Sequence, residues 1–483
     1  MLVVLSDLHF QQDPHGQNRN LESRSLRMFF EEIARAAKLK QAKDLTIVLN
    51  GDIFDYIRNQ AWFVPGKDGG ALRPYAELEP SQPLSDALEE RVWAIHQSIE
   101  QDPRVQPSIA LLEAIAHGTD DIFTEGVHPK FLFIPGTSDR LADMSVQVKS
   151  RLYDMLNLPG SPDDPFPRQI LFTKTPWRDW PHATRILDVP GKHVDYGTLI
   201  QHGHEYDWTA CEFNYDDNVL GRTPEPADAH LYRMSSLSDW IAIDVIGRLA
   251  KDFLDDCGGD ASKLIPENQF IYDCLMEADD VRPQLRVLSY LLWRLEGDPW
   301  LMIRELVRAH LVHAAKHQRL RQWLSQHDQS WLPDRADKIR AAVKTLASLS
   351  GAMPDSFLAG LGKRVSRRAG PDTIPLDLLR TDPIWQNPEV HFICHGHFHE
   401  PGSIPLGVID GHPKLAVCTG TWRRRHRQGL DEISHVAIRS MGYSIFYRPD
   451  EQTGNKAHRM EFWQGQVVTH QPDAPPQTDE DTP

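Results

Sequence analysis

Cysteine is scarce in this sequence, with five residues among 483: Cys211, Cys257, Cys274, Cys394 and Cys418. Their number is odd, and no two of them form a Cys-x-x-Cys pair. A disulfide framework is therefore not expected, and the pattern favours reduced thiols.

Long apolar runs are also missing. No hydrophobic stretch approaches the roughly 20 residues that a membrane-spanning helix requires, so no membrane span is expected. The strand-like residues Leu2 to Leu5 are followed at once by the polar residue Asp7, which leaves no room for a cleaved signal segment. Together with the reduced thiols, these absences predict a cytoplasmic protein.

The sequence also has no excess of basic residues. Lysine and arginine number 52 against 68 aspartates and glutamates, which gives a formal net charge of -16. Nonspecific nucleic-acid binding comes mainly from neutralising phosphates with basic side chains. Nucleic acid is therefore not a favoured partner.

Two short basic runs, at 422–427 and 363–368, are local exceptions. The first follows a strand-like segment, and its Arg423 and Arg424 are candidates for contacting a substrate phosphate. The alternative for both runs is a solvated basic loop, because charge runs usually stay in water.

Five short apolar runs of strand character end in groups of Asp and His residues. The runs and their following residues are Leu2–Leu5 with Asp7 and His9, Leu45–Leu49 with Asp52, Phe131–Ile134 with Asp139, Leu199–Ile200 with His202 and His204, and Val390–Cys394 with His397 and His399. Buried strands of one sheet deliver their side chains to a common edge, where crevices hold ligands. We therefore expect the five groups to meet.

Acidic and imidazole side chains that share a small site repel one another and lose hydration unless a cation compensates them. The gathering therefore predicts a metal centre. Mixed nitrogen and oxygen ligands suit zinc, manganese or iron, and these three stay open. For any one of these residues taken singly, the alternative is a structural hydrogen-bond partner.

The same residues, in the same order, resemble the calcineurin-like metallophosphoesterase superfamily, whose pattern reads Asp-x-His, Gly-Asp, Gly-Asn-His-Asp/Glu, His-Gly and Gly-His-x-His. This chain reads Asp7-Leu8-His9, Gly51-Asp52, Gly136-Thr137-Ser138-Asp139, His202-Gly203 and Gly396-His397-Phe398-His399. Four blocks match in order, each after an apolar run, which is a far more specific signal than any block alone.

The resemblance implies two divalent metal ions, with manganese as the first choice and zinc or iron as alternatives. The implied ligands are Asp7, His9 and His399 at site 1, Asp52 as the bridge, and His202 and His397 at site 2. Two cations about 3.5 to 4 Å apart clamp a phosphoryl group and lower the pKa of a bound water, which attacks in line. Asp52 would thus be both a ligand and a catalytic residue.

The third block departs from the family pattern. The family's asparagine, a site 2 ligand, is Thr137 here, and its histidine, which is assigned to leaving-group protonation or transition-state stabilisation, is Ser138. A serine hydroxyl cannot act as a general acid near neutral pH, so weaker metal binding at site 2 and a slower reaction are expected. His204, two residues past His202, is the candidate catalytic substitute.

The fold that the resemblance implies is an α/β fold, a four-layer αββα sandwich with two facing sheets covered by helices. The length exceeds that of a single core, so a large insertion is expected. The ligand blocks divide the chain into a first core part at 1–219, a helical insertion or cap at 220–383, a second core part at 384–465 and a disordered acidic tail at 466–483.

Helical periodicity supports the insertion. Apolar residues recur at three- and four-residue spacing in Leu237–Leu254, Leu285–Leu295, Trp300–Leu324 and Ala336–Leu349. His310, His313 and His317 share a helical spacing that could mimic a metal face. Because no acidic partner accompanies them, we expect an ordinary surface or packing role.

Metal-dependent hydrolysis of a phosphodiester or a phosphomonoester is the function that the resemblance implies, with the phosphate ester as partner. A diester is favoured, because the missing acid suits a better leaving group. Two alternatives stay open: a nuclease of the same superfamily, and a degenerate, non-catalytic scaffold that binds metal or a phosphorylated ligand. The sequence indicates no particular oligomer.

Overall fold

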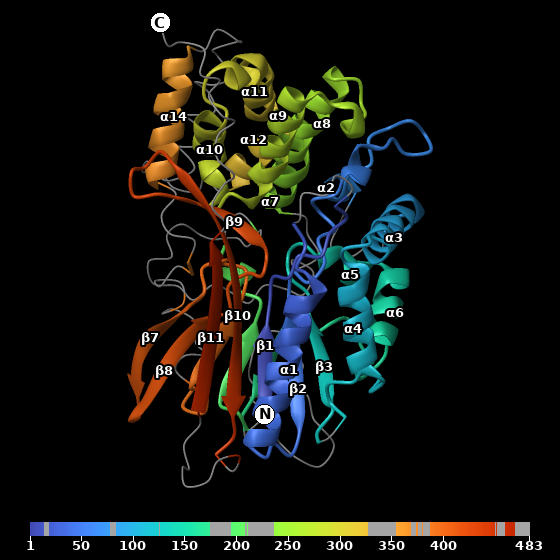
Figure 1. Cartoon of the computed structure of the whole chain (residues 1–483), viewed down its shortest axis with the longest axis vertical. Coiled ribbons are helices and arrows are strands. Elements are labelled where there is room, and N and C mark those ends of the chain that lie inside the picture. Colours follow the sequence, from blue (N-terminus) through green and yellow to red (C-terminus); the bar gives the residue numbers. More distant parts are fainter. Residues whose placement is uncertain are drawn as a thin grey trace, which may run out of the picture.

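The computed structural model describes residues 1–13, 19–77, 84–124, 126–173, 195–207, 210, 236–326, 354–368, 373–374, 379, 387–449, 451 and 459–468. Two β-sheets with flanking helices form one end of the molecule, and a helical unit forms the other (Figure 1). The protein is thus a mixed α/β structure.

The first sheet has the strand order β11-β10-β1-β2-β3, and β9 pairs with β10. Its strands are β1 (Leu2–Leu5), β2 (Leu45–Asn50), β3 (Pro129–Ile134), β9 (Arg424–Gln428), β10 (His435–Tyr447) and β11 (Arg459–Val468). β1, β2 and β3 are parallel, and β10 runs antiparallel to β1. The unbroken apolar runs suit these parallel strands, which are buried on both faces.

The second sheet has the order β4-β5-β6-β8-β7. Its strands are β4 (Gln169–Phe172), β5 (Thr198–Gln201), β6 (Phe392–His395), β7 (Gly402–Ile409) and β8 (His412–Cys418). β5, β6 and β8 are parallel, whereas β4 and β7 lie antiparallel at the two edges.

The two sheets pack face to face over a shared apolar core. Val48 and Leu132 of the first sheet contact this core from one side, and Ile200 and Phe392 of the second contact it from the other. The five ligand-bearing strands therefore lie in two sheets, in agreement with the two sheets that the resemblance implied. β1, β2 and β3 belong to the first sheet and β5 and β6 to the second, so face-to-face packing brings their ends together.

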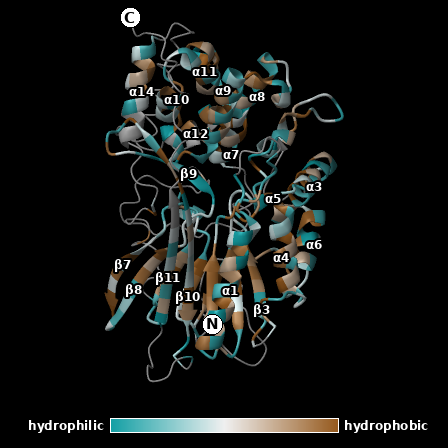
Figure 2. Ribbon diagram, viewed as in Figure 1, coloured by the Kyte–Doolittle hydropathy of each residue, from teal (hydrophilic) through white to brown (hydrophobic). Residues whose placement is uncertain are grey.

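Helices cover the outer face of the first sheet. They are α1 (Ser23–Leu39), α3 (Asp86–Glu100), α4 (Gln106–Ala116), α5 (Arg140–Met144) and α6 (Val146–Met155). The short helix α2 (Pro74–Glu77) lies beside the helical unit instead (Figure 1). Apolar side chains of α1, α3, α4 and α6 pack against outward-facing residues of the strands, such as Ile47 and Phe133. β1 and β3 are drawn largely in hydrophobic colours, whereas the helices show both hydrophobic and hydrophilic residues (Figure 2).

The outer face of the second sheet contacts Tyr206, Ile374 and Leu379. A fourth, helical layer over this face is not seen in the ranges that the structure describes. Three layers, helices on sheet on sheet, are therefore present, and the complete four-layer sandwich stays a prediction.

The helical unit has its own hydrophobic core, which includes Phe253, Tyr272, Ile303 and Leu358. Its elements are α7 (Leu237–Trp240), the π-helix η4 (Ile241–Gly247), α8 (Arg248–Asp256), α9 (Pro266–Glu277), α10 (Val287–Arg294), α11 (Asp298–Lys316), α12 (Gln318–Gln326) and α14 (Asp355–Arg368), with short 3-10 turns η5 (Ala261–Lys263), η6 (Ala278–Asp280) and η7 (Gln284–Arg286). No helix in the described part of the chain combines the length and apolar character that crossing a membrane requires.

Most of the helices expected in the insertion are present. The stretch Trp300–Leu324 is not one helix, however, because α11 ends at Lys316 and α12 begins at Gln318. The predicted helix Ala336–Leu349 lies outside the described residues, as does Cys211, and the other four cysteines are free thiols. β11 extends to Val468, into the segment predicted as a disordered tail.

Candidate metal centre

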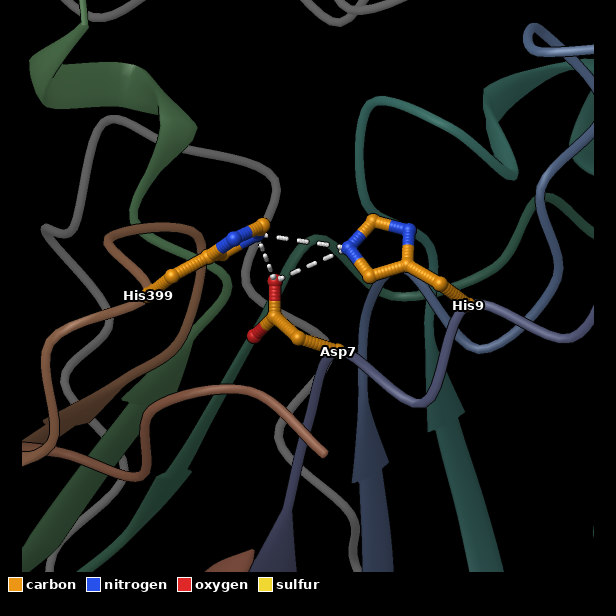
Figure 3. Close-up of side chains that lie close together, drawn as sticks. All are labelled: Asp7, His9 and His399. Carbon is orange, nitrogen blue, oxygen red and sulfur yellow. Dashed lines mark hydrogen bonds and ion pairs between the residues drawn. The ribbon is translucent and has the colours of Figure 1, made fainter. Parts of the chain in front are cut away.

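Asp7, His9 and His399 converge at the carboxyl ends of β1 and β6, as Figure 3 shows. Asp7 Oδ1 lies 3.7 Å from His9 Nε2 and 3.5 Å from His399 Nε2, and the two imidazole nitrogens are 3.3 Å apart. All three side chains are buried. One carboxylate oxygen and two imidazole nitrogens thus face a common point, as expected for site 1.

Asp52, His202 and His397 form a second group of potential ligands, from the ends of β2, β5 and β6. Asp52 Oδ2 lies 3.4 Å from His202 Nε2 and also 3.9 Å from His9 Nε2 of the first group. This one carboxylate therefore joins the two groups. The six residues predicted as metal ligands are all brought together, and metal binding by them remains a proposal.

The backbone at these positions is strained. Among the described residues, eight outside glycine have a positive φ, and four of them are the candidate ligands Asp7 (54°), His9 (51°), Asp52 (53°) and His397 (62°). Left-handed backbone costs a non-glycine residue about 1 to 3 kcal/mol and concentrates at functional sites. The side chains of all four residues belong to the two groups of potential ligands.

Glycines give the ligand side chains the space they need. A Cβ atom at Gly51 would overlap the His202 ring, and one at Gly136 would overlap Asp52 and lie 2.7 Å from His202 Nε2. A Cβ atom at Gly396 would overlap Asp7. Three motif glycines are thus required because a ligand side chain packs directly on each of their Cα atoms.

The burial of so many ionisable groups shifts their pKa values strongly. Burial alone would raise the pKa of Asp52, but the neighbouring imidazoles, His202 foremost, hold it well below its usual range. Burial would lower the pKa of His202, yet Asp52 and Asp7 raise it to about 10. Burial also raises the pKa of Asp7, with a further contribution from Asp52. Each of these buried carboxylates stays ionised only if a positive charge lies nearby.

The donor set fits a divalent cation. Asp7 Oδ1 and His202 Nε2 are buried and make no hydrogen bond, although each faces its group of potential ligands. Buried polar atoms are normally satisfied, and a coordinated cation would satisfy both. Two imidazoles and one carboxylate per group suit zinc, manganese or iron.

Residues behind the candidate ligands hold them in place. Asp55 Oδ2 lies 3.6 Å from His9 Nδ1, on the side of the ring away from Asp7. Asp139 accepts hydrogen bonds from the backbone N–H groups of Ile53, at 2.9 Å, and of Gly136. Asp139 therefore braces the two loops, and burial together with the charge of Asp52 raises its pKa to about 7.

The atypical third block lies against the bridging carboxylate. Thr137 Oγ1 is 3.2 Å from Asp52 Oδ2, and the backbone N–H of Ser138 donates to Asp52 Oδ1 at 2.7 Å. The hydroxyl of Thr137 thus contacts the carboxylate that joins the two groups of potential ligands.

His204 is buried beside the second group. Its ring centroid lies 5.3 Å from that of His202 and 6.2 Å from that of His397. Burial and the charges of these two histidines hold the pKa of His204 well below its ordinary value. The predicted position of His204 beside His202 and His397 is therefore found, whereas its catalytic role stays a prediction.

Asp207 is a contact that the sequence interpretation missed. Its Oδ2 lies 2.9 Å from His397 Nε2, just after the short helix η2 (His204–Tyr206). The signal available in the sequence was an acidic residue five positions after His202, on the same loop. Asp207 orients the candidate site 2 imidazole much as Asp55 orients His9.

The basic run at 422–427 is not a solvated loop. Arg423 and Arg425 have only 2% and 1% of their surface exposed, and 424–428 forms β9. Arg423 contacts Asp280 and Asp55, Arg424 donates to Glu277 at 2.7 Å, and Arg425 donates to Glu400 at 2.9 Å. The contacts give Arg423 and Arg424 a structural role, and substrate binding by them remains untested.

The other histidine group also differs from expectation. His310 has an acidic partner, because its Nε2 lies 3.0 Å from Asp252 Oδ2. His313 and His317 line an open cavity of about 790 Å³ together with His310. None of the three belongs to a group of potential metal ligands found among the described residues.

Gly136→Ala should remove cation binding at site 2 without unfolding the protein, because the added methyl group collides with Asp52 and His202. Elemental analysis after dialysis against manganese should show bound metal reduced by about half relative to wild type. Gly360→Ala is the matched control, since a Cβ atom at that helical position meets nothing within 4 Å. Equal metal content in the two variants would contradict the packing argument.

Comparisons with known proteins do not assign the chain to a family. No model of a known protein family matches the chain. A search of curated proteins likewise finds no match. The assignment to the calcineurin-like superfamily therefore remains an inference from the motifs.

Proposed function

We propose that this chain is a metal-dependent phosphoesterase of the calcineurin-like type, which hydrolyses a phosphodiester or phosphomonoester at a dinuclear site. One observation carries the proposal: Asp52 Oδ2 lies within 3.9 Å of His9 Nε2 and 3.4 Å of His202 Nε2. A carboxylate shared between two Asp–His groups is what a pair of closely spaced cations requires.

Two divalent cations, manganese first and zinc or iron as alternatives, would neutralise charge on the phosphoryl oxygens and activate a water for in-line attack. The chain itself supplies fixed geometry. The buried carboxylate of Asp55 and the partly exposed carboxylate of Asp207 lie against the imidazoles of His9 and His397 before any substrate arrives, so little reorganisation remains for the reaction.

A phosphodiester is the favoured substrate class. Ser138 replaces the family's histidine, so proton donation to a poor leaving group is weak, and an ester with a good leaving group depends on it least. A nuclease gains no support from Arg423, Arg424 and Arg425, because all three pair with carboxylates. Nucleic acid is therefore not the favoured substrate.

A non-catalytic scaffold is the second candidate, and Thr137 with Ser138 favours it. Threonine is a poor cation ligand, and its Oγ1 contacts Asp52 rather than extending past it. The scaffold would hold one cation or a phosphorylated ligand without turnover. Membership of a fold family does not secure activity.

Asp52→Asn tests the proposed enzyme directly. Hydrolysis of bis-p-nitrophenyl phosphate with added manganese should fall at least about 100-fold, since even changes behind metal ligands cost about 10- to 100-fold. Metal content should fall from two ions per chain. Asp410→Asn is the control, because Asp410 also has a positive φ (50°) but lies exposed in the β7–β8 turn. Turnover unaffected by Asp52→Asn would refute the proposal.

His204→Ala tests the substitute for the missing family histidine. If His204 moves the leaving-group proton, turnover should fall about 100-fold or more, while metal content stays close to that of wild type. His412→Ala, at an exposed position of β8, provides the comparison. An unchanged rate would remove His204 from the reaction.

Rebuilding the third block separates the enzyme from the scaffold. The double change Thr137→Asn and Ser138→His should strengthen cation binding at site 2 and raise turnover by about 10²- to 10⁴-fold, the range typical of general acid help. Calorimetric manganese titration and the same diester assay measure the two effects. Two bound cations without turnover in wild type and double variant alike would favour the scaffold.

A further inference from the structure

A buried cluster of charged side chains connects site 1 to the helical unit. Its members are Arg19, Asp55, Arg58, Asp279, Asp280 and Arg423. No side chain among them is more than 10% exposed. Three acids balance three bases, and buried charges persist only when they are paired in this way.

A continuous route of contacts leads through this cluster from the helical unit to His9. Asp280 accepts a hydrogen bond from Arg423 Nε. Arg423 Nη1 in turn donates to Asp55 Oδ2 at 3.1 Å, and that same oxygen faces His9 Nδ1 at 3.6 Å. One planar guanidinium therefore holds an acid of the helical unit and an acid of the core in a fixed relative position.

The position of Asp280 is itself fixed by the backbone that follows it. Val281 forms a parallel bridge with His426 of β9, and the N–H of Arg282 donates to the carbonyl of His426 at 3.2 Å. The turn η6, which carries Asp279 and Asp280, is thus attached to the first sheet. The helical unit cannot shift here without disturbing the strand that follows Arg423.

We propose that Asp280 is a positioning residue for site 1, acting through Arg423 and Asp55 on His9, so that the helical unit sets the cation affinity of that site. The inference rests on the proposed metal centre. An imidazole that binds a cation through Nε2 is oriented and made more basic by an acceptor on the side of Nδ1, and the carboxylate oxygen that faces His9 Nδ1, at 3.6 Å, is Asp55 Oδ2.

The balance of charge around Asp55 explains how Asp280 would affect cation binding at site 1. Asp55 Oδ2 already accepts from Arg58 Nη1 at 3.0 Å as well as from Arg423. While Asp280 is ionised, it draws part of the Arg423 charge to itself. Without Asp280, the charge of Arg423 would act on Asp55 undivided, beside that of Arg58, and Asp55 would become a weaker acceptor for His9.

The experiment isolates site 1 by working in a His397→Ala background, where site 2 has lost a ligand. Adding Asp280→Asn should weaken manganese binding, measured by isothermal titration calorimetry, by about 10-fold. Glu277→Gln is the matched control: it removes an acid of the same segment, whose partner is Arg424 at 2.7 Å, but it touches neither Arg423 nor Asp55. In the His397→Ala background, Glu277→Gln should leave the dissociation constant for manganese unchanged.

A double-variant cycle distinguishes positioning from a general loss of stability. In the presence of Asp55→Asn, adding Asp280→Asn should change manganese affinity by less than about 2-fold, because the route to His9 is already broken. Independent effects of the two changes would overturn the inference. If Asp280→Asn does not fold, Arg423→Lys keeps the charge but cannot hold both carboxylates, and it should also weaken binding about 10-fold.

Failure of the inference and failure of the proposed function give different results. Should wild type bind two cations and hydrolyse the diester while Asp280→Asn binds manganese as Glu277→Gln does, only the role of Asp280 is refuted. Should wild type bind no cation under saturating manganese, the metal centre itself is refuted, and the inference falls with it.

Discussion

The Asp52 carboxylate is the interaction on which the rest of the site depends. It is held by a backbone N–H of Ser138 at 2.7 Å, flanked by His9 and His202, and placed by a left-handed backbone conformation next to Gly51. A buried carboxylate in this position is stable only while positive charge surrounds it. The histidines, the glycines and the braced loops around it all serve that requirement.

The same requirement extends beyond the candidate ligands. Asp55 and Asp207 stand behind His9 and His397, and Arg423 and Arg425 of the 422–427 run are buried among further carboxylates instead of facing water. Through Arg423 and Asp280 the balance of charge reaches the helical unit. That unit is therefore joined to the core by buried ionic contacts as well as by packing, and its position relative to site 1 is restricted.

Much of the arrangement could be predicted from local patterns. Apolar runs such as Leu45–Leu49 predict buried strands, and the residues that follow them predict where the ligands emerge, because strand ends carry loops at a sheet edge. Helical periodicity likewise predicted α8, α10 and α11. The break at His317 was not predictable in this way, since the apolar pattern continues through it.

Taken alone, the sequence determined which side chains could bind a cation and that six of them occur in the order of a known motif, because the strand–loop pattern is local. Only the tertiary structure decided how the strands divide between the two sheets, that Asp207 contacts His397, and that Arg423 is buried against Asp280. These outcomes depend on contacts between residues far apart in the chain, whose free energies no local pattern records.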